Sequence, residues 1–189
     1  MIFDEDINES LTTLKKGGII LYPTDTIWGL GCDPTNPAAV EKIFKIKSRE
    51  QGKSMMIIVD GEAMLERYLN EVPEIAWELI SVSDDPLTII YSGGKNLAPG
   101  ICGDDGSVGI RICRDEFCRE LIKRFRKPLV STSANFSGKP SPEKFSEIES
   151  SLIAATDYVV KYRQDDMRKY TPSPVIKIDP DGTVKIIRK

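Results

Sequence analysis

Apolar residues recur along the chain with two different periods. Helical spacing predicts helices over residues 4–16, 38–47, 61–69, 73–82, 116–125 and 143–153. Short apolar runs, some of them alternating with polar residues, predict strands over 19–22, 55–59, 87–91, 106–113, 129–131, 158–161, 175–178 and 184–187. The last two strands flank Asp181-Gly182, a dipeptide typical of a hairpin turn.

The order of these elements predicts an α/β fold. Strands alternate with helices over most of the chain and pair as a hairpin at its end, so we expect a twisted open mixed sheet with flanking helices. A chain of 189 residues fits one domain, residues 1–189. Ligands of open α/β sheets bind beyond the strand ends, so the polar segments that follow strands are where a site is expected.

Composition removes several classes of chemistry. Hydrophobic residues make up 40% and charged residues 29%, which suits a packed core and not a disordered chain. Histidine is absent, so this chain alone cannot form a Ser-His-Asp triad, a Cys-His dyad or a histidine-ligated zinc site. The net charge of −3 excludes a generally basic nucleic-acid coat but leaves room for local basic patches.

The four cysteines are predicted to be free thiols, because no Cys-x-x-Cys pair occurs among Cys32, Cys102, Cys113 and Cys118. The acidic N-terminus has no apolar segment typical of a signal peptide. No apolar run approaches the ~18 residues that a membrane span needs. We therefore expect a cytoplasmic protein that makes no membrane contact.

A polar loop follows the first strand, with the sequence Pro-Thr-Asp-Thr-Ile-Trp-Gly-Leu-Gly from Pro23 to Gly31. It is either a plain turn in which Asp25 caps backbone amides or a small pocket for a polar metabolite. A second hydroxyl-rich segment, 131–141, follows the strand at 129–131. Such hydroxyls suit phosphate, ribose or a base edge, and no nearby base is present to make a serine nucleophilic.

Positive charge is concentrated in two places. One cluster of cations is formed by Lys42, Lys45, Lys47, Arg49 and Lys53. It holds more positive charge than stabilisation of a helix C-terminus requires, and several such cations suit a polyphosphate. The segment 52–54 resembles the end of a Walker A loop, but position 47 is not glycine and a strand follows, so a P-loop is rejected. On the strand at 106–113, residues 107, 109 and 111 share one face, which is either solvent-exposed or binds an anion such as a substrate carboxylate.

In their order along the chain, these motifs resemble the YrdC-type (TsaC) threonylcarbamoyl-AMP synthase family. The resemblance rests on Pro23 to Gly31, Lys47 with Arg49, Ser107 with Arg111, the Ser-Ala-Asn-x-Ser-Gly motif from Ser133 to Gly138, Ser173, and Arg188. It covers about residues 10 to 188 and implies a YrdC-like fold with a basic concave face. Longer family members carry a second domain, so the resemblance implies the single-domain form.

The resemblance implies that L-threonine, bicarbonate and ATP are converted to threonylcarbamoyl-AMP and pyrophosphate, for the N6-threonylcarbamoyladenosine modification of tRNA. It implies that threonine and its carbamate are held by Thr26, Arg111, Ser131 and Ser173. It implies that ATP is bound by Lys47, Arg49, Lys53, Ser107, Ser133, Asn135, Ser141 and Arg188, with Lys47 and Arg49 positioning the reactants. Mg²⁺ is expected on the phosphates without a protein ligand, and partner proteins are expected to complete the transfer to tRNA.

Two alternatives remain open from the sequence. The same basic concavity suits a non-catalytic translation or ribosome-assembly factor that contacts tRNA or double-stranded RNA. A second basic cluster would serve it, formed by Arg111, Arg114, Arg119, Lys123, Arg124, Arg126 and Lys127. Acidic residues interleave with this cluster, which is also typical of the solvated face of a helix. The third reading is a carbamoyl-transfer domain that acts on another acceptor.

Overall fold

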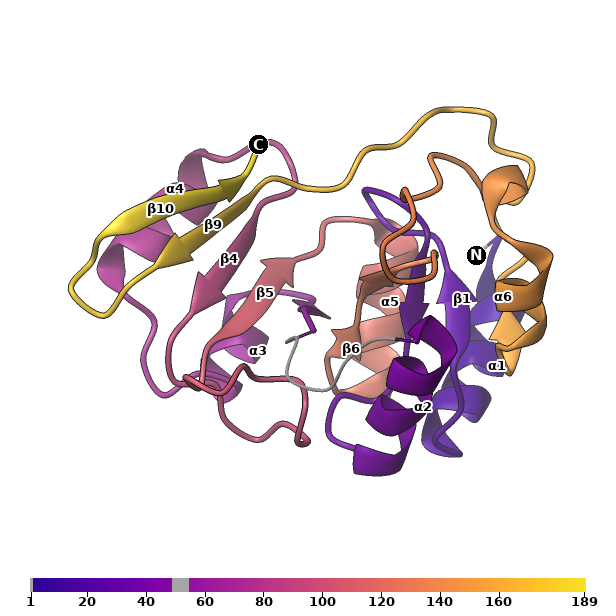
Figure 1. Ribbon diagram of the computed structural model, residues 1–189, viewed down its shortest axis with the longest axis horizontal. Coiled ribbons are helices and arrows are strands. Elements are labelled where there is room, and N and C mark those ends of the chain that lie inside the picture. The colour runs from indigo at the N-terminus through magenta and orange to yellow at the C-terminus, as the bar shows by residue number, and fades with distance from the viewer. Residues whose placement is uncertain (1, 49–54) are drawn as a thin grey trace.

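The computed structural model describes residues 2–48 and 55–189 (Figure 1). The helices are α1 (Asp4–Lys15), α2 (Pro37–Lys47), α3 (Glu62–Arg67), α4 (Glu74–Val82), α5 (Glu116–Phe125), the short 3-10 helix η1 (Phe145–Glu147) and α6 (Ser150–Ala154). The strands are β1 (Ile20–Tyr22), β2 (Gly29–Gly31), β3 (Ile57–Val59), β4 (Thr88–Tyr91), β5 (Val108–Ile112), β6 (Leu129–Val130), β7 (Thr132–Ser133), β8 (Tyr158–Val159), β9 (Val175–Ile178) and β10 (Val184–Arg188).

The strands form two open sheets, each of which mixes parallel and antiparallel pairs. The first sheet has the order β7-β2-β1-β8, with β1 parallel to β8 and antiparallel to β2. The second has the order β10-β9-β4-β5-β3-β6, with β3 parallel to β5 and β4 parallel to β9. In Figure 1 the first sheet lies on the right with α1, α2 and α6, and the second extends to the left, where it ends in the β9–β10 hairpin.

The predicted α/β class with an open mixed sheet and flanking helices is confirmed, with three differences in detail. The strands divide into two hydrogen-bonded sheets where one was expected. Strands β2 and β7 occupy segments predicted as loops. The predicted helix 143–153 is split into η1 and α6, because the backbone is extended at Ile148 and Glu149. Burial of Ile148 in the core stabilises this break.

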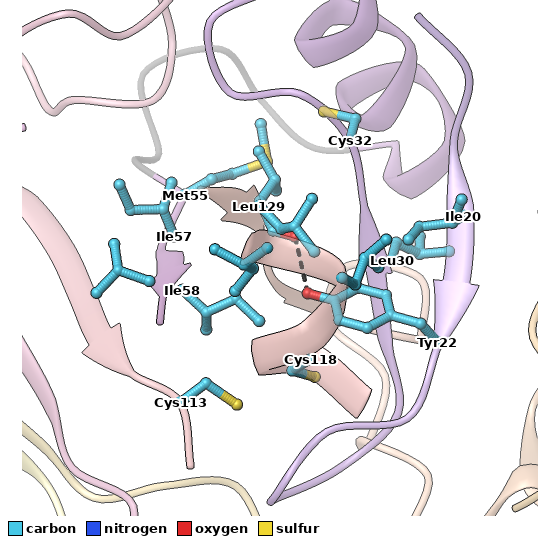
Figure 2. Close-up of a cluster of buried hydrophobic side chains, with 14 of the residues drawn as sticks. Ile20, Tyr22, Leu30, Cys32, Met55, Ile57, Ile58, Cys113, Cys118 and Leu129 are labelled. Atoms are coloured by element: carbon cyan, nitrogen blue, oxygen red, sulfur yellow. Dashed lines mark hydrogen bonds between the residues drawn. The ribbon is translucent and has the colours of Figure 1, made fainter. Parts of the chain in front are cut away.

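The two sheets are joined at a shared apolar core (Figure 2). The buried Tyr22 hydroxyl of β1 donates to the carbonyl oxygen of Val130 in β6 at 3.0 Å. The Tyr22 ring lies so close to Gly31 that an added Cβ would sit 2.6 Å from its Cε1 atom, so only glycine fits at this position. The Val130 amide also donates to the carbonyl oxygen of Cys32 at 3.0 Å. The spacing between the sheets is therefore fixed by buried contacts.

A long linker, residues 160–174, runs from β8 in the first sheet to β9 in the second, across the top of the view in Figure 1. Its start is held by Arg163, which pairs through Nη2 with Asp115 Oδ2 at 2.6 Å and donates through Nη1 to the carbonyl oxygen of Thr24. Asp115 also caps α5 by accepting from the Cys118 amide. The linker is thus anchored before it reaches the second sheet.

Two further expectations concern the cysteines and membranes. All four cysteines are free thiols, as predicted. Within residues 2–48 and 55–189, no helix combines the length and the apolar character that crossing a membrane requires.

Candidate functional site

A cavity of about 320 Å³ lies between the two sheets. Its wall on one side comes from the loop before β2 and from the segment around β7. On the other side it comes from β4, β5, β9 and the end of β10. Among the described residues its lining contains two arginines and several hydroxyls but no carboxylate. Such a lining attracts anionic ligands.

Seven of the residues predicted from the sequence line this cavity together. The first group, Thr26, Ser131, Ser133 and Ser141, comes from loops around the first sheet. The second group, Arg111, Ser173 and Arg188, comes from the second sheet and the end of the linker. Segments up to 162 positions apart in the sequence, from 26 to 188, therefore converge on one hollow.

The loop that carries Thr26 is fixed by its own hydrogen bonds. The Thr24 hydroxyl oxygen accepts from the Thr26 amide at 3.0 Å, lies 3.0 Å from the Thr26 hydroxyl and donates to the carbonyl oxygen of Ile27 at 2.9 Å. Trp28, the next residue but one, is buried and packs against the Phe145 ring with centroids 4.8 Å apart. Thr26 is thus presented to the cavity by a rigid turn.

Arg111 lies on β5, with its side chain 2% exposed. Its Nη1 atom forms an ion pair with Asp25 Oδ1. Its Nε atom is buried and has no hydrogen-bond partner among the described residues. Gly109 lines the cavity on the same face of β5. A Cβ at Gly109 would lie 3.3 Å from Met56 Cβ, so glycine leaves this part of the wall open.

Ser173 and Arg188 form the end of the cavity near the hairpin. The Ser173 hydroxyl lies 2.8 Å from the hydroxyl of Thr88 on β4. The Ser173 carbonyl oxygen accepts from Arg188 Nε at 3.1 Å and from Arg188 Nη2 at 2.7 Å. Burial, together with the positive charge of Arg111, lowers the pKa of the Arg188 guanidinium. Two cations thus face one hollow, which favours a ligand with negative charge.

The predicted residues Lys47 and Asn135 lie behind the cavity wall. Lys47 is buried, and its Nζ atom donates to the carbonyl oxygens of Ser133 at 2.6 Å and of Asn135 at 2.7 Å. The Asn135 side chain accepts from the Ser133 hydroxyl and donates to the carbonyl oxygen of Lys139. Both residues therefore shape the loop that presents Ser133, and neither is part of the cavity lining.

One further predicted residue, Ser107, is described but does not reach the cavity. Ser107 lies at the start of β5 in a turn, where its amide donates to Asp105 Oδ1 at 2.9 Å, and it is not part of the lining. Arg49 and Lys53 lie outside the described residues. The shared face predicted for residues 107, 109 and 111 therefore reaches the cavity only at positions 109 and 111.

Sequence reasoning missed two contributors to the site. Thr88 lines the cavity from β4. In the sequence, nothing distinguishes it from an ordinary strand residue. Asp25 was part of the first motif, but its pairing with Arg111 depends on a contact across 86 positions. The sequence holds an acidic residue in a polar loop and an arginine on an apolar strand, but it does not show that the two meet.

The second basic cluster is largely engaged within the molecule. Arg114 donates to the carbonyl oxygens of Ile80, Ser83 and Asp84 at the end of α4. Arg124 pairs with Glu120 and Asp4, and Lys127 pairs with Asp33. Counting Arg111, four of the seven cations have intramolecular partners. These four cations are therefore not free to contact RNA without giving up their partners.

Comparison with known proteins gives a consistent set of relatives. Residues 12–189 match the family model Sua5_yciO_yrdC, described as telomere recombination. The chain is 31% identical over 169 residues to the threonylcarbamoyl-AMP synthase of Stenotrophomonas maltophilia, with 88% of this chain and 91% of the relative covered. It is 36% identical over 140 residues to that of Psychromonas ingrahamii, with 72% and 73% covered.

Solved structures agree with this similarity. The crystal structure of P. abyssi Sua5 complexed with L-threonine matches with a TM-score of 0.81 and 26% identity, over 92% of this chain and 51% of that chain. The chain therefore spans about half the length of that protein. E. coli YciO has the same fold, with a TM-score of 0.84 at 24% identity, over 98% of this chain and 89% of that chain.

Proposed function

The chain belongs to the Sua5/YrdC family, and we propose that it makes threonylcarbamoyl-AMP and pyrophosphate from L-threonine, bicarbonate and ATP. The product supplies the N6-threonylcarbamoyladenosine modification of tRNA. Relatives named threonylcarbamoyl-AMP synthase match most of this chain and of their own length, which supports the proposal. So does the threonine complex of P. abyssi Sua5.

The observation that carries the proposal is the convergence of seven predicted hydroxyl and guanidinium residues on one cavity, whose described lining contains no carboxylate. An amino acid and a nucleotide both bring negative charge to such a site. Two separate guanidinium groups, that of Arg111 on β5 and that of Arg188 on β10, give each ligand one guanidinium partner. A cavity of about 320 Å³ also falls in the lower part of the range found for small-molecule sites, roughly 300–1,000 Å³.

We assign threonine and its carbamate to the Arg111 end of the cavity. Arg111 supplies donors for the carboxylate, because guanidinium N–H groups match carboxylate oxygens in geometry. Thr26, Ser131 and Ser173 supply hydroxyls around it. Fixed hydroxyls distinguish a ligand that carries its own hydroxyl from an apolar isostere, because a buried donor left unpaired is costly.

We assign the nucleotide to the part of the cavity lined by Ser133, Ser141 and Arg188. Lys47 and Asn135 support this part by holding the loop 133–139 in place. Ser107, Arg49 and Lys53 stay predicted contacts of the nucleotide. On this assignment the α-phosphorus lies next to the carbamate, between the two groups of residues.

The chemistry needs little beyond positioning and charge. The threonine amine attacks the carbon of bicarbonate, water leaves, and a carbamate forms. A carbamate oxygen then attacks the α-phosphorus of ATP, and the bond to the bridging oxygen breaks with the release of pyrophosphate. Fixed donors and cations stabilise the charge that develops, and no histidine base is required. Mg²⁺ is expected on the phosphates, because it prefers phosphate oxygens and water as ligands.

The wider context is part of the same proposal. We infer that other proteins carry the threonylcarbamoyl group to tRNA, so that a contact of this chain with tRNA or double-stranded RNA is secondary. We propose that residues 1–189 form one domain and that the protein is located in the cytoplasm, where tRNA is modified. In this proposal the substrates bind in the cavity and not on a charged outer surface.

The test is the substrate dependence of pyrophosphate release by the purified protein with ATP and Mg²⁺. We expect release only when both L-threonine and bicarbonate are present, and a return to background when either is omitted or when D-threonine replaces L-threonine. No tRNA is needed for this step. Release that does not depend on threonine, or no release from the complete mixture, contradicts the proposal.

A further inference from the structure

The ion pair between Arg111 and Asp25 joins the two sheets at the cavity. Arg111 belongs to β5 of the second sheet, whereas Asp25 lies in the loop between β1 and β2 of the first. Arg111 is 2% exposed and Asp25 is 13% exposed. A cation so deeply buried needs a charged partner, because removing an ion from water costs several kcal/mol. Asp25 supplies that partner.

Asp25 is held in place independently of Arg111. Its Oδ2 atom accepts from the Arg114 amide at 3.1 Å. The Arg114 side chain is itself fixed by carbonyl oxygens at the end of α4, among them that of Ser83 at 2.6 Å. The neighbouring Thr24 and Thr26 are fixed in the same turn. The carboxylate therefore acts as a fixed anchor for the guanidinium.

The pairing determines which donors of Arg111 stay available. Nη1 donates to Asp25, and Arg111 makes no other hydrogen bond within the described part of the chain. Because a guanidinium is planar, fixing Nη1 fixes the direction of the remaining N–H groups. Arg111 also lines the cavity, so N–H groups that have no partner among the described residues are held at the cavity wall.

The pair also changes the charge of the cavity. As a unit, Arg111 and Asp25 carry no net charge, whereas among residues 2–48 and 55–189 the Arg188 side chain bonds only to the neutral carbonyl of Ser173 and keeps its positive charge. Within the one cavity, Arg111 thus offers directed donors without net charge, and Arg188 offers a net cation. A polyphosphate prefers the net cation, and a singly charged carboxylate suits the directed donors.

We propose that Asp25 is a positioning and specificity residue that sorts the two anionic substrates. By orienting Arg111 and cancelling its charge, Asp25 reserves Arg111 for the amino-acid carboxylate and leaves phosphate groups to Arg188. This inference rests on the proposed function, since it assigns the amino acid to Arg111. Asp25 acts on the substrate through Arg111 and does not need to touch it.

Steady-state kinetics of pyrophosphate release by Asp25→Asn test the inference. We expect the KM for L-threonine to rise by about tenfold, because one charge-assisted hydrogen bond no longer orients Arg111. The KM for ATP is expected to stay within about twofold, because Arg188 is untouched. Inorganic phosphate should compete with L-threonine in Asp25→Asn but not in the wild type, because Arg111 then carries an uncancelled charge.

Two comparisons separate this role from a purely structural one. In an Arg111→Ala background, adding Asp25→Asn should cause no further loss of kcat/KM for L-threonine. Asp25→Glu keeps the charge and should restore resistance to phosphate. Asp33→Asn breaks a comparable ion pair, with Lys127 outside the cavity, and should lower thermal stability without changing the KM for L-threonine. Asp25→Ser replaces Asp25→Asn if the latter does not fold.

One set of results would contradict the proposed function, and a different set would contradict the role of Asp25. A wild-type protein without threonine-dependent pyrophosphate release contradicts the proposed function itself. An active wild type overturns the role of Asp25 alone if the neutral variants raise both KM values equally, show no phosphate competition against L-threonine, or lose activity additively with Arg111→Ala.

Discussion

The ammonium of Lys47 lies 2.6 Å from the carbonyl oxygen of Ser133, and the two residues are 86 positions apart in the sequence. Lys47 ends α2, is 2% exposed, and also donates to the Asn135 carbonyl oxygen. A lysine that the charge pattern assigns to a phosphate thus cross-links a loop through its backbone. Its effect on the nucleotide is transmitted through the position of Ser133.

The first prediction concerns Lys47→Met, which keeps the length of the side chain and removes its donors. The carbonyl oxygens of Ser133 and Asn135 then lose a charged partner, which costs about 1–3 kcal/mol of stability. We expect a lower midpoint in urea unfolding and weaker ATP binding by calorimetry. Lys45→Met is the matched control, because Lys45 is exposed and pairs with Glu41 on the surface. Unchanged stability and ATP affinity in Lys47→Met would refute the cross-link.

The second prediction separates the charge of Arg188 from its hydrogen bonds. Arg188→Ala should raise the KM for ATP by about tenfold through loss of a charged contact. It should also raise the KM for L-threonine, because the Ser173 carbonyl loses its two bonds. Arg188→Lys keeps the positive charge but not the forked pair of N–H donors. It should therefore restore the KM for ATP more fully than the KM for L-threonine. Lys185→Ala on the same strand is the control, and equal recovery of both substrates would contradict this division.

The third prediction concerns the thiols. Cys32, Cys113 and Cys118 are buried, and Cys102 is half-buried. Burial raises the pKa of the Cys32, Cys102 and Cys118 thiols, which keeps them protonated and slow to react. We expect a disulfide reagent to modify Cys102 alone in the folded protein, and all four thiols in guanidinium. Rapid modification of two or more thiols in the native protein would count against the described core.

The fourth prediction is a dependence of stability on pH. Hydrogen bonds from Ser107, followed by one from Lys177, lower the pKa of Asp105 to about 2. The folded value lies below the unfolded value of about 3.9, so this stabilisation is present above about pH 4 and is lost as the pH falls toward 2. Asp105→Asn should therefore lower the midpoint of urea unfolding at pH 7. Between pH 4 and 2 its midpoint should change less with pH than that of the wild type. Asp104→Asn should keep the wild-type change, and identical curves for all three proteins would contradict the assignment.

The sequence predicted the helices and most strands, because apolar periodicity is a local signal. It could not predict β2 and β7, which are three and two residues long. Glycines at both ends of β2 disfavour a strand on their own, and the strand forms because Leu30 pairs with Leu21 on one side and Thr132 on the other. Strands of this kind depend on partners that are distant in the sequence.

The candidate site shows the same division between local and distant information. Motifs that follow strand ends located Thr26, Ser131 and Ser133, because loops at those ends converge. Charge patterning grouped Lys47 with the phosphate-binding residues, but the spacing of charges does not reveal that an ammonium points into the carbonyls of a distant loop. Pairing of Asp25 with Arg111 likewise requires the three-dimensional arrangement.

The most direct test of the central claim, that one cavity brings an amino acid to the α-phosphorus of a nucleotide, is isotope transfer from ¹³C-bicarbonate. The purified protein is incubated with ATP, Mg²⁺, L-threonine and labelled bicarbonate, and the adenylate product is analysed by mass spectrometry. The account predicts a threonine-containing adenylate heavier by the single ¹³C, formed by the wild type and reduced in Arg111→Ala and Arg188→Ala. An adenylate of threonine without the label, or no adenylate at all, would contradict it.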